Sequence, residues 1–313
     1  MILINSFSER MDMAIQKCDG YNIFSWEWFY HLYPFTTENI NGYIDYFNLK
    51  NNSLLTVGSS CDQALNAILK DVKDITILDI NPFLKYYYYL KIAAILELDL
   101  GEYLLFLRFK DYPKVFKDNK EVFKIEIFNK IKLTLRLLDY ESYLFWDELF
   151  QGYSSILVRQ NLFFEDEYRN SIIKECNNYL NNELEYNKLK KKVTRIEPTF
   201  ITGDIKDINL DNKYDNIWLS NIFSYNYSCD DIKKILDKFK NSLSYNGQIL
   251  ISYLYDMNLG IEYQDNWPII YNINKILDYF KNNDIEIKTF TGIKGLLFED
   301  ENYKRDSVLI YKK

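Results

Sequence analysis

Histidine is nearly absent from this 313-residue chain, which has only His31, and cysteine is scarce, with Cys18, Cys61, Cys176 and Cys229. The cysteines form no C-x-x-C pair, and a single histidine cannot complete a Cys/His set, so no zinc site is expected. Such widely spaced cysteines are typical of reduced thiols. The chain is therefore predicted to be a cytoplasmic protein.

The sequence also has no excess of basic residues, no apolar leader core at its N-terminus and no apolar run of membrane-spanning length. The 38 Lys and Arg residues are outnumbered by 45 Asp and Glu residues, and the net charge is −7. A chain without a basic footprint for a phosphate backbone is not expected to act on nucleic acid. The N-terminus has no apolar leader core, and no window reaches the ~20 apolar residues of a membrane span. Peripheral contact with a bilayer stays open.

The most informative feature is a strand–turn–helix–strand pattern. An apolar run within 54–69 (LLTVGSSCDQALNAIL) ends at Gly58, and an amphipathic helix pattern begins at Asp62. A second apolar run within 75–83 (ITILDINPF) ends at Asp79, 21 residues after Gly58. In folds that hold a nucleoside across a parallel sheet, the glycine lets the backbone approach the ligand, and the carboxylate accepts hydrogen bonds from the ribose hydroxyls.

The turn after the first strand lacks the later glycines of a full G-x-G-x-x-G, since Ser60 and Cys61 stand in their place. A dinucleotide pyrophosphate needs a closer backbone approach than such a turn allows. A cofactor with a ribose but no phosphates suits the pattern better, and S-adenosylmethionine is the common one. The alternative is an ordinary βαβ unit in which Gly58 and Asp79 serve only the turns.

Polar residues also end two later predicted strands. The run 199–205 (TFITGDI) has Asp204 near its end, and the run 214–223 (YDNIWLSNIF) carries Ser220 and Asn221 after its apolar core. The carboxyl ends of parallel strands line the crevice where α/β sheets bind ligands. These side chains are therefore expected to face the same ligand as the first unit.

The rest of the chain completes a sheet. The pattern predicts a helix at Cys229–Leu243, a turn at 245–247, a strand at 248–256, a helix at 273–283, and strands at 285–290 and 307–313. This order predicts an α/β fold with a Rossmann-like methyltransferase sheet, mostly parallel, with an antiparallel C-terminal strand.

A long interval interrupts this order. About 100 residues separate the helix that begins near Pro82 from the strand at 199, where such a connection usually takes about 2–6 residues. The interval is helical in pattern, so we expect a helical insertion at 101–196 within a Rossmann-like domain formed by 51–100 and 197–313. The insertion is predicted to be a cap over the crevice or a surface for an acceptor, a membrane or a partner protein.

Residues 1–50 form an aromatic-rich segment that is predicted to close the cofactor site. Its helix is expected to start with Thr36 or Thr37 as N-cap and to run to Phe47. Inside the insertion, a longer helical pattern covers 166–192 and ends in the basic cluster KLKKK. A solvated helix end is the simpler interpretation of that cluster, and binding of anionic lipid headgroups is the alternative.

These elements resemble those of a known family, the aminocarboxypropyltransferase family of betaine-lipid synthesis, within the class I S-adenosylmethionine-dependent fold. The resemblance covers roughly residues 24–256. It is carried by VGSSCDQAL (57–65), DINP (79–82), the Leu-Lys-x-Ala-Ala helix (90–94), LSNI (219–222) and, more weakly, Trp26–Glu27 and FWDELFQGY (145–153). Ser60–Cys61 departs from the family's usual Ala-Gly.

The resemblance implies a transferase that moves a 3-amino-3-carboxypropyl group from S-adenosylmethionine to an oxygen or nitrogen nucleophile of a small-molecule, lipid or peptide acceptor. The residues themselves leave the transferred group open, because the pose decides which carbon–sulfur bond of the sulfonium is attacked. A methyltransferase acting on a non-nucleic-acid acceptor is one alternative. A non-catalytic sensor or scaffold that binds S-adenosylmethionine is another.

The candidate cofactor-binding residues are Trp26, Gly58, Ser59, Ser60, Asp62, Asp79, Ile80, Asn81, Asp204, Ile205, Ser220 and Ile222. The turn after the first strand is assigned to the methionine portion, and the acid that ends the second strand to the ribose. Asp204 and Ile205 are assigned to the adenine, with Ile80 and Ile222 against its two faces. For Asp62, a role as helix N-cap is the alternative.

The candidate catalytic residues are Glu27, His31 and Asn221, with Tyr33 and Thr36 as weaker candidates. Glu27 is predicted to hold the cofactor's ammonium or to take a proton, unless it forms only a surface ion pair. His31 has the chemistry of a general base. Its aromatic surroundings are more typical of a packed, hydrogen-bonded imidazole.

Overall fold

The computed structural model describes residues 6–19, 31–36, 38–107, 120–153, 158, 162–163, 174–224, 228–252, 268–291 and 305–313. The strands are β1 (Ser53–Val57), β2 (Asp74–Asp79), β3 (Thr199–Thr202), β4 (Tyr214–Trp218), β5 (Leu243–Ile251), β6 (Ile285–Thr291) and β7 (Arg305–Lys312). The helices are α1 (Phe7–Cys18), α2 (Ile40–Tyr43), α3 (Asp62–Leu69), α4 (Leu84–Glu97), α5 (Leu100–Leu107), α6 (Lys120–Leu138), α7 (Tyr140–Gly152), α10 (Glu183–Lys190), α11 (Cys229–Asn241) and α12 (Pro268–Phe280). Over these ranges, no helix combines the length and hydropathy that crossing a membrane requires.

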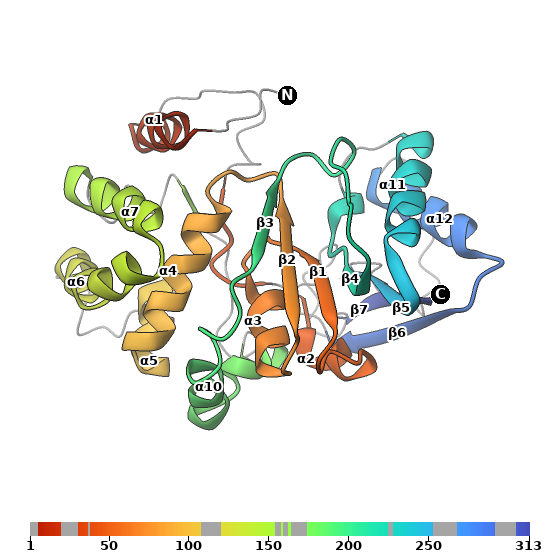
Figure 1. Cartoon of the computed structure of the whole chain (residues 1–313), viewed down its shortest axis with the longest axis horizontal. Coiled ribbons are helices and arrows are strands. Elements are labelled where there is room, and N and C mark those ends of the chain that lie inside the picture. The colour runs from red at the N-terminus through yellow and green to blue at the C-terminus, as the bar shows by residue number, and fades with distance from the viewer. Residues whose placement is uncertain are drawn as a thin grey trace.

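The described strands form one seven-stranded sheet in the order β3-β2-β1-β4-β5-β7-β6 (Figure 1). Strands β1 to β5 run parallel, and β7 is antiparallel to both β5 and β6. This confirms the predicted Rossmann-like methyltransferase sheet with an antiparallel C-terminal strand. The chain adds β2 and β3 on one side of β1, and β4 and β5 on the other. Such a switch point opens a crevice at the carboxyl ends of the strands.

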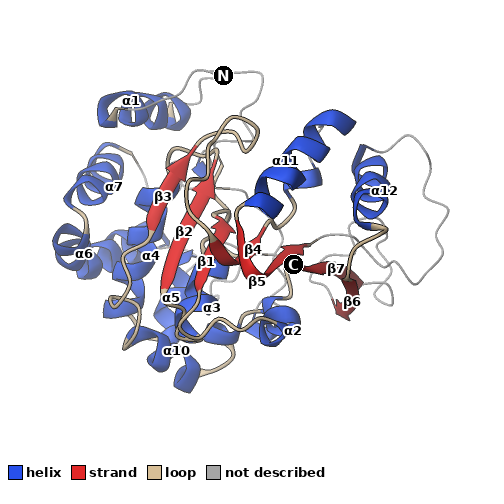
Figure 2. Ribbon diagram, turned by 45° about the vertical axis from the view of Figure 1, so that its right-hand side comes forward, coloured by secondary structure: helices blue, strands red, loops and turns tan. Residues whose placement is uncertain are grey.

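Consecutive strand residues point to opposite faces of the sheet, and each face has its own apolar core. Leu54 and Ile77 belong to one core, together with residues of α3 to α7 and α10. Their neighbours Leu55 and Leu78 belong to the other core, with residues of α11 and α12. Figure 2 shows α11 and α12 on the side of the sheet away from α4, α6 and α7. The sheet is therefore covered on both faces, as its apolar strands require.

The described part of the insertion shares the first core. Ile131 of α6 and Phe145 and Trp146 of α7 are fully buried in the cluster that also contains α4. The indole Nε1 of Trp146 donates to the carbonyl oxygen of Tyr86 on α4 at 2.8 Å. The insertion helices are thus packed on the outer side of α4 rather than around a core of their own.

The turn predicted at 245–247 is wrong, because β5 starts earlier, at Leu243, and runs through these residues. Between β4 and β5 the register moves from Tyr214↔Leu243 to Asn216↔Gln248, so the extra residues of β5 form a bulge. Asn246 in this bulge has a φ of 62°, a left-handed conformation that asparagine tolerates. The Asn-Gly signal therefore marks an irregularity within a strand.

The helix start predicted at Thr36 or Thr37 is also wrong. Thr37 lies outside the described residues, and Asn39 is the N-cap of α2, its side chain accepting from the backbone N–H of Gly42 at 2.8 Å. A 3₁₀ turn at Ile44–Tyr46 follows directly. The sequence signal failed because asparagine binds nearby backbone N–H groups as readily as threonine does.

The pattern expected to be one helix over 166–192 is interrupted where the structure describes it. A 3₁₀ turn at Asn178–Leu180 precedes α10, whose N-cap is Asn182. The Asn182 side chain accepts from the backbone N–H of Glu185 at 3.0 Å. Asparagine side chains compete with the helix for backbone hydrogen bonds, which explains the break in this asparagine-rich stretch.

Candidate functional site

A pocket of about 750 Å³, counting its open mouth, lies at the carboxyl ends of β1, β2, β3 and β4. This is the crevice expected at the switch point of the sheet. Its walls are formed by His31, Tyr33, Val57, Ser59, Leu78, Asp79, Ile80, Asn81, Gly203, Asp204, Ile205, Asn221 and Ile222. The lining combines apolar side chains with two carboxylates, and the described residues that form it include neither lysine nor arginine.

Asp79, the last residue of β2, is tied to the backbone on both sides of the pocket floor. Its Oδ2 accepts from the backbone N–H of Ser59 at 2.7 Å, and its Oδ1 accepts from the N–H of Asn81 at 2.9 Å. Burial raises the pKa of this carboxyl, while the backbone donors act against the rise. The backbone N–H of Ile80 also acts on this carboxyl. Because an ionised carboxylate has about four acceptor positions, Asp79 retains acceptor capacity for a ligand hydroxyl.

Gly58 is required by the close approach of its neighbours. A Cβ at this position would lie 1.8 Å from Cδ2 of Leu84 and 2.9 Å from Oδ2 of Asp79. The next residues of the turn, Ser59 and Cys61, adopt left-handed conformations with φ of 46° and 66°. Such strained residues cluster at ligand-binding turns. The loop thus brings its backbone against Asp79 at the pocket floor.

The turn after β4 has a similar form. Ser220 is left-handed, with φ of 48°, and the next residue, Asn221, lines the pocket. Ser220 itself is buried, and its hydroxyl donates to the carboxylate of Glu38. The backbone N–H of Ser252, just after β5, donates to the carbonyl oxygen of Ser220 at 3.2 Å. The position of Asn221 is therefore fixed from behind by buried polar contacts.

The segment 31–36, here called the strap, forms one wall of the pocket. The carbonyl oxygen of His31 accepts from Nδ2 of Asn81 at 3.0 Å, so the strap is attached to the end of β2. Further along, the hydroxyl of Tyr87 on α4 donates to the carbonyl oxygen of Pro34 at 2.8 Å. His31 and Tyr33 both line the pocket. That residues 1–50 close a cofactor site stays a prediction.

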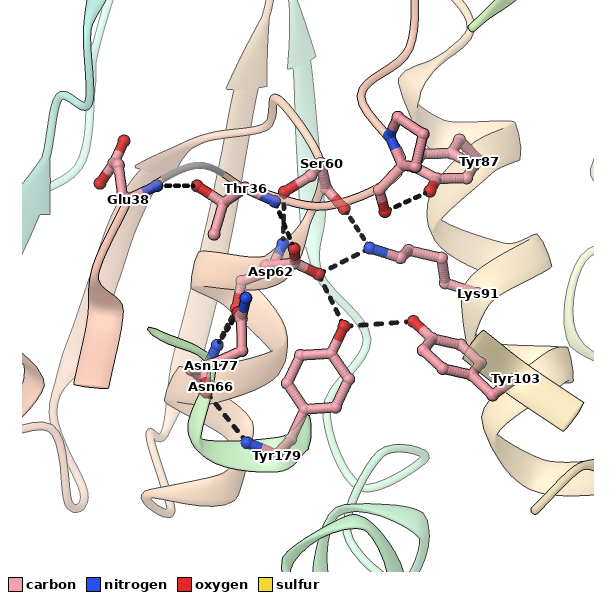
Figure 3. A network of polar contacts seen from close by, with 11 residues as sticks. Thr36, Glu38, Ser60, Asp62, Asn66, Tyr87, Lys91, Tyr103, Asn177 and Tyr179 are labelled. Atoms are coloured by element: carbon pink, nitrogen blue, oxygen red, sulfur yellow. Dashed lines mark hydrogen bonds and ion pairs between the residues drawn. The ribbon is translucent and has the colours of Figure 1, made fainter. Parts of the chain in front are cut away.

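The strap ends on a buried ionic network around Asp62 (Figure 3). Lys91 Nζ donates to Oδ1 of Asp62 at 2.6 Å and to the carbonyl oxygen of Ser60 at 2.7 Å, and both charged side chains are 0% exposed. The same Oδ1 accepts from the hydroxyl of Tyr179 at 2.7 Å. Oδ2 accepts from the backbone N–H of Thr36 at 2.6 Å. One carboxylate thus joins the strap, α3, α4 and the insertion.

Most of the predicted site residues come together. Those that line the pocket are His31, Ser59, Asp79, Ile80, Asn81, Asp204, Ile205, Asn221 and Ile222. Gly58 lies directly beneath, whereas Ser60, Asp62 and Ser220 are buried behind the lining. Trp26 and Glu27 lie outside the described residues. Ligand contact by any of these residues stays a prediction.

For Asp62 and Glu38, the structure differs from what the sequence suggested. The N-cap alternative for Asp62 is wrong, because Cys61 is the N-cap of α3 and Asp62 is the first helical residue. Glu38, which contacts Ser220 behind the pocket lining, was not predicted, since a glutamate after two threonines is typical of a helix start. Its contacts with residues after β4 and β5 span more than 180 positions of sequence, and no local pattern signals them.

In the described part of the chain, no group of three or more His, Cys, Asp or Glu side chains is arranged to hold a metal ion. The described cysteines Cys18, Cys61 and Cys176 are buried. Burial raises the pKa of Cys18 and Cys176 to about 12, so these thiols are not poised as nucleophiles.

Comparison with known proteins identifies no family. No family model matches the chain, and no curated protein matches it. Among solved structures, the chain is similar to the N-methyltransferase NodS from Bradyrhizobium japonicum WM9 in complex with S-adenosyl-L-homocysteine, with a TM-score of 0.39, 8% identity, and coverage of 99% of this chain and 89% of that chain. It is also similar to an S-adenosylmethionine-dependent methyltransferase from Clostridium acetobutylicum ATCC 824, with a TM-score of 0.37, 11% identity, and coverage of 98% and 99%.

Proposed function

We propose that this chain is an S-adenosylmethionine-dependent transferase acting on a small-molecule, lipid or peptide acceptor. The observation that carries the proposal is the floor of the pocket, where Asp79 at the end of β2 lies against the glycine turn after β1. A carboxylate in this place is suited to accept both ribose hydroxyls of an adenosyl ligand.

The charge of the lining supports an adenosyl sulfonium over a phosphate-bearing nucleotide. Asp79 and Asp204 are acidic, and His31 is the one residue of a basic type among those that line the described pocket. Phosphates are usually met by Arg, Lys or helix N-termini. A ligand that carries positive charge and no phosphate is therefore favoured in this pocket.

The apolar side chains of the lining support the adenine assignment. Ile80 and Ile222 line the pocket, as does Ile205, and Asp204 stands beside them with its Oδ1 accepting from the backbone N–H of Lys206 at 2.9 Å. Apolar side chains with a few placed polar groups are typical of small-molecule sites. In the proposed complex the isoleucines pack on the ring and Asp204 accepts from its amino group.

For the transferred group, we propose methyl first. When bound, S-adenosylmethionine supplies an activated carbon, and the protein's task is to orient it toward the nucleophile and exclude water. Methyl transfer is the commonest chemistry on this type of sheet. The resemblance to aminocarboxypropyltransferases favours the larger group, and no family model supports it. Asn221 and His31, which both line the pocket, are the proposed groups beside the reacting centre.

The by-product separates these reactions. The protein is incubated with S-adenosylmethionine and a cell extract, and the adenosyl products are identified by mass spectrometry. S-adenosylhomocysteine indicates methyl transfer, and methylthioadenosine indicates transfer of the aminocarboxypropyl group. Binding without either product would favour the non-catalytic sensor, and no binding at all would refute the proposed function.

Replacing Asp79 by alanine is expected to weaken binding of S-adenosylhomocysteine by about 1–3 kcal/mol, because ligand hydroxyls and the N–H of Ser59 lose their acceptor. Titration calorimetry measures the loss. Asp74→Ala is the matched control, since Asp74 starts the same strand at its far, exposed end. An unchanged Kd in a folded Asp79→Ala variant would remove Asp79 from the site.

A further inference from the structure

The carboxylate of Glu38 is buried, at 2% exposure, within a shell of neutral donors. Its Oε1 accepts from the hydroxyl of Ser220 and from Nε2 of Gln63 at 3.1 Å. Its Oε2 accepts from the hydroxyls of Tyr43 at 2.8 Å and Ser252 at 3.0 Å. These donors come from α2, from the first turn of α3, and from the ends of β4 and β5. Such convergence holds the carboxylate in one place.

The shell contains no cation among the described residues that contact Glu38. The nearby Lys91 is already paired with Asp62 and donates to the carbonyl oxygen of Ser60. Burial without an opposite charge raises the pKa of the Glu38 carboxyl, and its hydrogen bonds only partly offset this. Burying a carboxylate without a positive partner is costly, so this position calls for a source of positive charge.

A second buried acceptor lies beside the carboxylate. The amide oxygen Oε1 of Gln63 has no hydrogen-bond partner in the described structure, although Gln63 is 1% exposed. The amide cannot be reversed to pair it, because Nε2 donates to Glu38. Nearly all buried polar groups in proteins are hydrogen-bonded. The unpaired Gln63 oxygen can accept one further donor, and the neighbouring carboxylate favours a donor that carries positive charge.

The two acceptors lie at the switch point, between the turns that border the pocket. Gln63 is in the first turn of α3, four residues after Ser59, and Ser220 immediately precedes Asn221. Both Ser59 and Asn221 line the pocket. Glu38 and Gln63 do not line the pocket themselves, so a ligand group would reach them by extending from the pocket between these two turns.

We propose that Glu38 and Gln63 bind the α-ammonium group of the cofactor's amino-acid portion. This inference rests on the proposed function. An ammonium has three donors and no acceptor, so the unpaired Gln63 oxygen can accept one of its hydrogen bonds and the negative charge of Glu38 complements its charge. The four acceptor positions of Glu38 are filled by its shell, so a direct bond from the ammonium requires one of the serine hydroxyls to turn away. The hydroxyls of Ser220 and Ser252 both donate and accept, which lets the shell adjust when the ammonium enters.

Three ligands test this assignment on the full-length chain. S-adenosylmethionine carries the ammonium and a sulfonium, S-adenosylhomocysteine carries the ammonium with a neutral sulfur, and methylthioadenosine carries neither. For Glu38→Gln, we expect the Kd of the first two ligands to rise by about tenfold or more, the effect of losing one charge-assisted hydrogen bond. The Kd for methylthioadenosine should stay within about twofold, a change below the usual effect of one hydrogen bond.

Other patterns overturn the inference. Equal loss for all three ligands would give Glu38 a purely structural role, loss for S-adenosylmethionine alone would place it at the sulfonium, and no loss would remove it from the site. If Glu38→Gln does not fold, Gln63→Leu should show the same selectivity, and uniform affinities there refute the assignment. Should the wild-type chain bind none of the three ligands, the proposed function fails as well.

Discussion

Replacing Gly58 by alanine is expected to destabilise the protein by about 1–3 kcal/mol, the usual cost of overpacking a close-packed site, and to abolish binding of adenosyl ligands. The added methyl would overlap Cδ2 of Leu84 at 1.8 Å, and Leu84 is itself buried. Relief requires the Leu84 side chain to change its conformation within packed surroundings, or α4 or the turn after β1 to shift. We expect the turn to shift, which would lengthen the hydrogen bond from the N–H of Ser59 to Asp79 and change the pocket floor.

The measurement is thermal or urea unfolding, followed by calorimetric titration of the folded variant with S-adenosylhomocysteine. Gly152→Ala is the control, because no heavy atom lies within 4 Å of the Cβ that it would add at the end of α7. That change should alter stability by less than about 0.5 kcal/mol. A Gly58→Ala variant with wild-type stability and Kd would show that the turn has room for a side chain.

Replacing Lys91 by methionine is expected to cost about 3–5 kcal/mol of unfolding free energy, because it leaves the buried carboxylate of Asp62 without its cation. Methionine retains most of the volume and the apolar contacts of the side chain, which packs against the rings of Phe35 and Tyr87. The loss therefore reports the charge rather than a cavity. Denaturant unfolding followed by circular dichroism gives the value.

Lys188→Met is the matched control, since Lys188 pairs with Glu185 on the surface of α10 and is 49% exposed. Exposed pairs contribute roughly 0–1 kcal/mol. In the double variant Lys91→Met/Asp62→Asn the buried charge is gone, and part of the lost stability should return. A cost for Lys91→Met no larger than that of the surface control would mean that Asp62 does not depend on Lys91.

The local part of this site was predictable from the sequence. The Gly58 turn, the acid at Asp79 and the polar end of the predicted strand at 214–223 are each encoded within a few residues. Because parallel strands end at the same edge of a sheet, the strand pattern alone places these residues side by side. The pocket lining follows the same logic, since Ile80 directly follows β2 and Ile222 lies four residues after the end of β4.

The long-range part was not predictable. The partners of Asp62 include Lys91 on α4 and Tyr179 in the insertion, 29 and 117 positions away. In the sequence, Lys91 is one lysine within a helix of tyrosines and leucines, with nothing to signal full burial. The contacts of Glu38 were not predictable for the same reason, because its partners Ser220 and Ser252 are distant in the sequence. Contacts of this kind depend on tertiary packing, which hydrophobic periodicity does not encode.

Because the strap contacts both Asp62 and the pocket, the sheet expressed without it would not retain the same site. A chain shortened to begin at residue 51 would keep every strand, yet Asp62 would lose the Thr36 N–H and the pocket would lose the wall bearing His31 and Tyr33. Cutting out the turn at Asn178–Leu180 would take Tyr179 from the same carboxylate. The crevice at the strand ends thus depends on segments outside the sheet, and a chimaeric protein would need the strap and this distant turn as well as the strands.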